Sequence, residues 1–249
     1  MKKISVLALP RSGTTSLSSI FSNHCSQNEY LETESVRILS TSRLNHSFPK
    51  SIVAELVNRR WSESGMNLDA ASFNFMCPDI IAQLYSHMNY IFLLRDPIDW
   101  IESFCCMLNY YIALFEISNM PDWMLSYGYV FSPNFTWEGI LELISNPTSD
   151  SSNQLLKDFL DFWITENSQL LSFSLSNTVL YLETSSISSS LNQLSKFAGV
   201  PVHSLSTSTH VNKGKLRRSF LSTSQKAFVS HMTSDVVMSF RERANVFSL

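Results

Sequence analysis

Three short runs of apolar residues, each followed by a polar turn and a helical pattern, dominate the hydrophobic pattern of the chain. They span residues 4–9, 90–94 and 178–182. Continuous apolar runs of this length are typical of strands that are buried on both faces of a parallel sheet. The alternation of strand and helix therefore predicts an α/β fold with a central parallel sheet, in which ligands bind at the carboxyl ends of the strands.

Helical patterns fill most of the remaining chain. One follows the first strand over residues 14–22, one begins near Ile98, and one ends at Gly199, a typical helix-stop residue. The helix that ends at Gly199 spans residues 191–198, and further helical periodicity covers residues 52–61, 79–87, 139–145, 155–173 and 225–238. We expect loops at the serine-rich stretches 185–190 and 204–208. No internal repeat or Pro/Gly linker divides the chain, so we expect a single domain over residues 1–249.

Charge and cysteine content exclude several classes of function. The formal net charge of −3 argues against a protein that holds nucleic acid or another polyanion, because such proteins carry a marked basic excess. The four cysteines form no C-x-x-C pair and no Cys/His cluster with zinc spacing, so we expect neither a metal site nor a disulfide framework. The apolar stretch after Met1 is too short for a signal sequence or a membrane span, which indicates a cytoplasmic protein without a membrane partner.

The segment that follows the first strand carries the clearest chemistry. Residues 8–17 read ALPRSGTTSL, a Gly/Ser/Thr turn between a strand and a helix, which directs several backbone N–H groups at one small volume. Such a volume binds phosphate or sulfate. The predicted anion-binding residues of this loop are Arg11, Ser12, Gly13, Thr14, Thr15 and Ser16. Gly13 permits close backbone approach, and the planar guanidinium of Arg11 suits tetrahedral oxyanions. The alternative is an ordinary turn in which Ser12 or Thr14 caps the helix.

A second pair of candidate anion ligands follows the second strand. Arg95, Asp96 and Pro97 end that strand, and Ser103 lies eight residues after Arg95, one or two turns along the next helix. Arg95 and Ser103 can therefore converge on one anion. Asp96, directly before Pro97, is expected to cap that helix rather than to hold a metal.

These two motifs together resemble the sulfotransferases that use 3′-phosphoadenosine-5′-phosphosulfate. In that family a loop similar to PRSGTT binds the 5′-phosphosulfate, and an R-D-P strand end with a serine further along holds the 3′-phosphate. The resemblance implies a P-loop-like three-layer α/β/α fold, with helical insertions that form a lid over the acceptor. It also implies metal-free transfer of a sulfuryl group, with 3′-phosphoadenosine-5′-phosphate as product.

Two later segments are similar to further parts of the family pattern. Residues 182–184, followed by residues 197–201 (FAGVP), resemble the family's Y-E-D-L and F-L-G-V-P segment, although Leu182 replaces its tyrosine. The basic run at residues 212–218 resembles a late loop that closes over the 3′-phosphate. Its predicted cofactor-binding residues are Lys213, Gly214, Lys215 and Arg217. The alternative is a solvated basic surface segment.

Two other readings of the same residues stay open. A small-molecule kinase of the P-loop class would need G-x-x-x-x-G-K-[ST], but the first glycine is missing and Thr14 stands at the lysine. A non-catalytic nucleotide-binding or interaction protein would keep the anion loop but lack a base.

The general base cannot be the histidine of the cytosolic branch of the family, because its K-x-H segment is missing from residues 73–78. The bacterial and tyrosylprotein branches place a glutamate downstream of the loop arginine, at a spacing that corresponds to Glu32. We therefore predict Glu32 as the general base, with its pKa raised by partial burial. The weaker candidates are Glu29, Glu34, His24, His46 and His210.

The acceptor is expected to contact residues 96–156, a segment without any lysine or arginine. It contains eight carboxylates and eleven aromatic residues. An acidic, aromatic wall suits a neutral or cationic small molecule, such as the substrate of a natural-product tailoring enzyme. The alternative is that the aromatic residues form a helical core and the carboxylates a solvated face.

Overall fold

The computed structural model describes residues 1–207 and 219–246, and it confirms an α/β fold with a central parallel sheet. Five strands lie in the order β2-β3-β1-β4-β5, and all neighbouring pairs are parallel. The strands are β1 (Ile4–Leu7), β2 (Ser26–Gln27), β3 (Leu68–Asp69), β4 (Asn89–Leu94) and β5 (Val179–Glu183). The three predicted strands are confirmed within two residues, whereas the two-residue strands β2 and β3 were not predicted.

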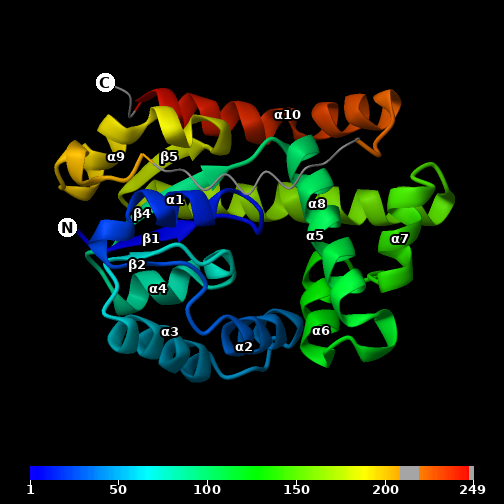
Figure 1. Cartoon of the computed structure of the whole chain (residues 1–249), viewed down its shortest axis with the longest axis horizontal. Coiled ribbons are helices and arrows are strands. Elements are labelled where there is room, and N and C mark those ends of the chain that lie inside the picture. The colour runs from blue at the N-terminus through cyan, green and yellow to red at the C-terminus, as the bar shows by residue number, and fades with distance from the viewer. Residues whose placement is uncertain (208–218, 247–249) are drawn as a thin grey trace.

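Helices cover both faces of this sheet (Figure 1). They are α1 (Thr14–Ile20), α2 (Glu32–Leu44), α3 (Lys50–Ser64), α4 (Pro78–Leu84), α5 (Pro97–Phe115), α6 (Asp122–Phe131), α7 (Trp137–Ser145), α8 (Asp150–Phe173), α9 (Leu191–Ala198) and α10 (Thr223–Val246). The predicted α9 agrees with the structure at both ends. A loop was expected at residues 185–190, but residues 184–189 form a short 3₁₀ helix, and α2 and α6 were not predicted.

Two separate apolar clusters define the three layers. On one face of the sheet, side chains such as Val6, Ile91 and Leu180 pack against α1 and α9. On the other face, side chains such as Phe92 and Tyr181 belong to a larger cluster with α3, α4, α5, α8 and α10. Because successive residues of a strand point to opposite faces, each central strand contributes to both clusters. This explains why these strands are continuous apolar runs in the sequence.

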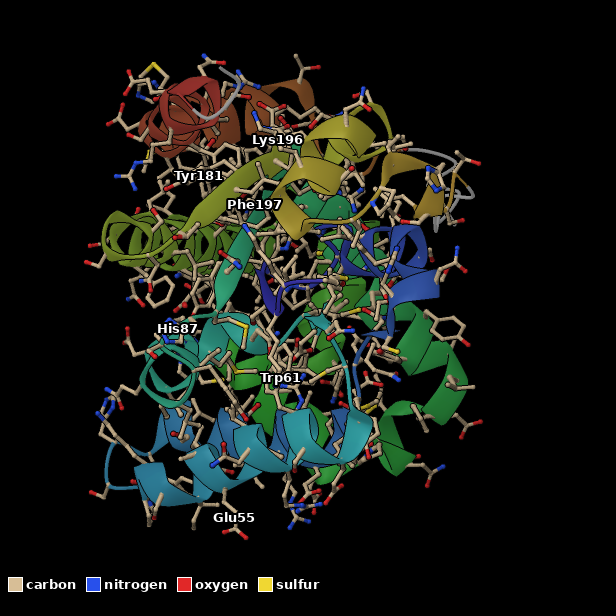
Figure 2. All side chains as sticks on the ribbon, turned by 90° about the vertical axis from the view of Figure 1, so that its left-hand side faces the viewer. Glu55, Trp61, His87, Tyr181, Lys196 and Phe197 are labelled. Carbon is tan, nitrogen blue, oxygen red and sulfur yellow. The ribbon has the colours of Figure 1, made fainter. Side chains whose placement is uncertain are left out.

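The amphipathic pattern of α3 shows how an outer helix attaches to the second face. Trp61 points inward and is only 3% exposed, whereas Glu55 points into solvent (Figure 2). Arg60, the neighbour of Trp61, is fully buried and is described further below.

Strand register brings three loops to one edge of the sheet. Leu7 pairs with Phe92, and Leu94 pairs with Glu183, so β1, β4 and β5 end close to one another. The Asp96 side chain accepts hydrogen bonds from the amides of Ile98 (2.9 Å) and Asp99 (3.1 Å), which confirms its predicted role as the cap of α5. No helix among the described residues has the length and apolar character needed to cross a membrane.

Candidate functional site

A cavity of about 1140 Å³ lies at this edge of the sheet. Its walls come from the loop after β1, the ends of β4 and β5, the start of α2, and helices α5, α6 and α10. This is the position at which open parallel sheets bind their ligands. Five of the six residues predicted for the anion loop line the cavity, as do Arg95, Ser103 and Glu32.

The loop after β1 has an unusual backbone that its neighbours hold in place. Arg11 has a φ angle of 68° and Gly13 one of 96°, both in the left-handed region. The hydroxyl of Thr184 donates to the Ser12 carbonyl (2.7 Å), and the indole N–H of Trp100 donates to the Pro10 carbonyl (2.8 Å). Strained backbone of this kind persists only where surrounding contacts determine it, and it concentrates at functional sites.

The first turn of α1 presents backbone donors to the cavity. The amide of Leu17 makes the first hydrogen bond of the helix, to the Gly13 carbonyl (3.0 Å). The amides of Thr14, Thr15 and Ser16 therefore precede the regular hydrogen bonds of α1. Ser12 is the exception among the predicted loop residues. Its amide donates to the Leu9 carbonyl (3.1 Å), its side chain is buried, and it does not line the cavity.

Arg95 and Ser103 lie together as the sequence predicted, and Arg11 also contacts Ser103, which the sequence did not predict. The Arg11 Nε donates to the Ser103 hydroxyl oxygen (3.2 Å), and Arg95 Nη1 lies at 3.2 Å from the same oxygen. Arg95 Nη1 also donates to the Arg11 carbonyl (2.6 Å). Burial lowers the pKa of Arg95, and the nearby Arg11 lowers it further, while Asp99 and Asp96 oppose this change. The two guanidinium groups thus face one part of the cavity.

Glu32 and Glu29 line the same cavity. Glu32 is the first residue of α2, and its side chain is open to the cavity. The pKa of Glu32 is raised to about 7, mainly by desolvation and then by the charge of Glu29 and a hydrogen bond with it. The predicted rise is thereby confirmed. Glu29 also accepts a hydrogen bond from the Ser72 hydroxyl (2.7 Å).

The other base candidates are not placed for this role in the described structure. Glu34 pairs with Arg59 (2.8 Å) and does not line the cavity. His24 lies 2.8 Å from the Ser204 hydroxyl, and neither His24 nor the exposed His46 lines the cavity. Four predicted cofactor-binding residues and one histidine lie outside the described residues: Lys213, Gly214, Lys215, Arg217 and His210.

The aromatic segment divides between cavity wall and core. Its cavity-lining members are Tyr110, Tyr111, Trp123, Tyr127 and Trp137. Trp100 and Phe104 instead stack in the core with a centroid distance of 5.1 Å. Of the eight carboxylates in this segment only Asp96 and Asp99 line the cavity, so the expectation of an acidic wall from residues 96–156 needs correction. The negative charge that faces the aromatic wall comes from Glu29 and Glu32.

Two further cavity residues were missed by the sequence reasoning. Asn28 lines the cavity and donates to the Thr15 hydroxyl (3.3 Å), and Arg241 of α10, which also lines it, pairs with Glu183 (2.7 Å). Neither Asn28 nor Arg241 lies in a motif, so only the three-dimensional structure identifies them. Leu182, at the place of the family's tyrosine, is buried in the sheet and does not line the cavity, whereas Glu183 and Thr184 do.

Within residues 1–207 and 219–246, no group of three or more His, Cys, Asp or Glu side chains is arranged to hold a metal ion. Comparison of the chain with protein-family models, with curated proteins and with solved structures gave no match. The residues of the cavity are therefore the basis on which function is inferred.

Proposed function

We propose that the protein is a sulfotransferase that moves the sulfuryl group of 3′-phosphoadenosine-5′-phosphosulfate to a hydroxyl or amine of a small molecule. The observation that carries this proposal is the convergence of Arg11, Arg95 and Ser103 in a cavity that Glu32 also lines. Two guanidinium groups in one cavity suit a ligand with more than one anionic group. The bound cofactor supplies an activated sulfuryl group.

The cationic and the acidic side chains of the cavity have separate tasks in this reaction. Arg11 and the first-turn amides of α1 stabilise the negative charge that moves to the leaving phosphate. Glu32 accepts the proton that the acceptor hydroxyl or amine loses as its oxygen or nitrogen bonds to sulfur and the sulfur–oxygen bond to the phosphate breaks. A pKa of about 7 suits this role, because a general base works best when its pKa is near the ambient pH.

The aromatic side chains that line the cavity define the class of acceptor. Among the described residues, the cationic side chains that line the cavity are Arg11, Arg95 and Arg241, and none comes from the helices of the aromatic wall. Tyr111 and Tyr127 interact electrostatically with Glu29 and Glu32, and burial, assisted by these carboxylates, raises the pKa of both phenols. The aromatic side chains and the two glutamates together favour a neutral or cationic acceptor over a sulfated or phosphorylated one.

Calorimetric titration tests the cofactor assignment. We expect the protein to bind 3′-phosphoadenosine-5′-phosphate more tightly than ATP, because we assign Arg95 and Ser103 to its 3′-phosphate, a group that ATP lacks. Arg11→Ala should abolish this binding or weaken it by at least tenfold, whereas Arg37→Ala, a change at an exposed arginine of α2, should leave it unaltered. Equal affinity for both nucleotides would contradict the assignment.

A radiolabelled sulfate-transfer screen over phenols, sugars, amines and guanidino compounds tests for catalysis. With an accepted substrate, Glu32→Gln should reduce kcat by at least a hundredfold with little change in nucleotide affinity. Glu34→Gln is the matched control, because Glu34 lies in the same helical turn but outside the cavity. Nucleotide binding without transfer to any acceptor would instead favour a non-catalytic binding protein.

A further inference from the structure

We propose that Arg60 is a positioning residue that fixes the general base relative to the anion loop, by holding the bend at residues 28–31. This inference rests on the proposed function. Arg60 itself lies outside the cavity, so it acts through the backbone that carries Glu29 and Glu32.

Arg60 joins three elements inside the core. Its Nη2 donates to both carboxylate oxygens of Asp69 (2.6 and 2.7 Å), and its Nη1 donates to the Asn74 amide oxygen (3.0 Å). The guanidinium carbon also lies 4.5 Å from the centroid of the Phe73 ring. Arg60 and Asp69 are both fully buried, so the position of the guanidinium is fixed by packing as well as by its hydrogen bonds.

The remaining nitrogen of Arg60 reaches the bend. Its Nε donates to the carbonyl oxygen of Tyr30 (3.2 Å). The two residues on either side of Tyr30 have left-handed backbones, with φ angles of 61° at Glu29 and 55° at Leu31. A left-handed conformation costs a residue with a side chain about 1–2 kcal/mol, so this bend needs an external contact to keep it. The buried guanidinium provides that contact.

The same bend is attached to the functional site at both ends. Asn28 donates to the hydroxyl of Thr15 in the anion loop (3.3 Å), and Ser72 donates to the carboxylate of Glu29 (2.7 Å). Leu31 is the cap residue of α2, and its carbonyl accepts from the Ser35 amide (2.8 Å). The bend therefore sets both the distance from the anion loop to the base and the direction in which α2 starts.

In-line transfer requires this distance to be held within a fraction of an ångström, because small displacements of reacting groups reduce rates strongly. The ionic contact between Arg60 and Asp69 balances the buried charge, whereas the contact with Tyr30 does not contribute to that balance. A lysine at position 60 keeps the charge but has one nitrogen, which cannot bond to Asp69, Asn74 and Tyr30 together.

The test compares Arg60→Lys with Arg59→Lys, a matched control at an exposed neighbour that pairs with Glu34 and Glu63. We expect Arg60→Lys to reduce kcat at least tenfold while the Kd for 3′-phosphoadenosine-5′-phosphate stays within twofold. Carbon-13 NMR titration of the glutamate carboxyls should show the pKa of Glu32 falling from about 7 by about one unit, as Glu29 and Glu32 separate. Arg59→Lys should change none of these quantities.

Ser72→Ala provides a second variant that removes a single contact with Glu29 and little packing volume. Like Arg60→Lys, it should lower the pKa of Glu32 in the NMR titration, and it provides this readout even if Arg60→Lys does not fold. Among the described residues, Glu32 interacts electrostatically with Glu29, Tyr111 and Tyr127, and neither substitution changes any of them. An unchanged Glu32 titration in the folded variants overturns the inference, whereas absent nucleotide binding by the wild type overturns the proposed function.

Discussion

Replacing Glu29 by glutamine gives the sharpest test of how the base is tuned. The pKa of Glu32 is raised from 4.5 to about 7, and after desolvation the two causes both come from Glu29: its charge and its hydrogen bond. Removing that charge favours ionisation of Glu32, so its pKa must fall. If Glu29 accounts for somewhat less than half of the rise, the pKa of Glu32 in the variant is about 6. The glutamine oxygen still accepts from Ser72.

The assay is the dependence of kcat/KM on pH between about 5 and 8.5. For the wild type we expect activity to rise with pH with a midpoint near 7, because the base must be deprotonated. For Glu29→Gln the midpoint should move to about 6, so that the fraction of ionised base at pH 6 increases about fivefold. Glu34→Gln should leave the profile unaltered. A midpoint in Glu29→Gln that stays near 7 or rises would refute this account of the carboxyl pair.

Three further predictions concern the anion loop and the base. Gly13→Ala should destabilise the fold by about 2–3 kcal/mol and weaken nucleotide binding in calorimetry, because a Cβ at this φ angle would lie 2.9 Å from the Ile187 side chain. Thr184→Val removes the hydrogen bond to the Ser12 carbonyl, so it should cost about 1 kcal/mol in denaturant unfolding and raise the Kd for 3′-phosphoadenosine-5′-phosphate about fivefold. The melting temperature of Glu32→Gln minus that of the wild type should increase as the pH is raised from 5 to 8. The folded wild type keeps the Glu32 proton up to about pH 7 and the unfolded chain releases it near 4.5, so stability falls as pH rises through this window. Because Glu32 is open to the cavity, the gain is about 2–4 °C, and a pH-independent difference would contradict it.

The fold was predictable where local pattern and burial agree. The buried strands β1, β4 and β5 are continuous apolar runs, and the cap residues Asp96 and Gly199 fix the ends of α5 and α9. The short strands β2 and β3 have no such pattern, because two residues contain no periodicity and their pairing depends on partners far along the chain. Helix α2 was missed because its buried face includes serines as well as Val36 and Leu39.

The approach of the cationic residues of the site to one another was predictable for a similar reason. Arg11, Arg95 and Ser103 each lie just after a strand or in the first turns of a helix, so strand order alone brings them to one edge of the sheet. The aromatic wall was only partly predictable. Tyr111 and Trp100 belong to the same helix, but one faces the cavity and the other the core, and sequence periodicity does not distinguish two buried faces.

The segment that carries Glu29 and Glu32 departs from local backbone rules, so the sequence predicted Glu32 as the base but neither the bend at residues 28–31 nor its contact with Arg60. Glu29 and Leu31 adopt backbone conformations that a sequence-based analysis assigns to glycine, and Glu29 and Glu32 place like charges side by side. Each of these features destabilises the isolated segment, so distant residues such as Arg60 must compensate for them. A base with a raised pKa requires this arrangement, because a relaxed, solvated carboxylate on a regular helix start would keep its ordinary pKa and act as a weaker base near neutral pH.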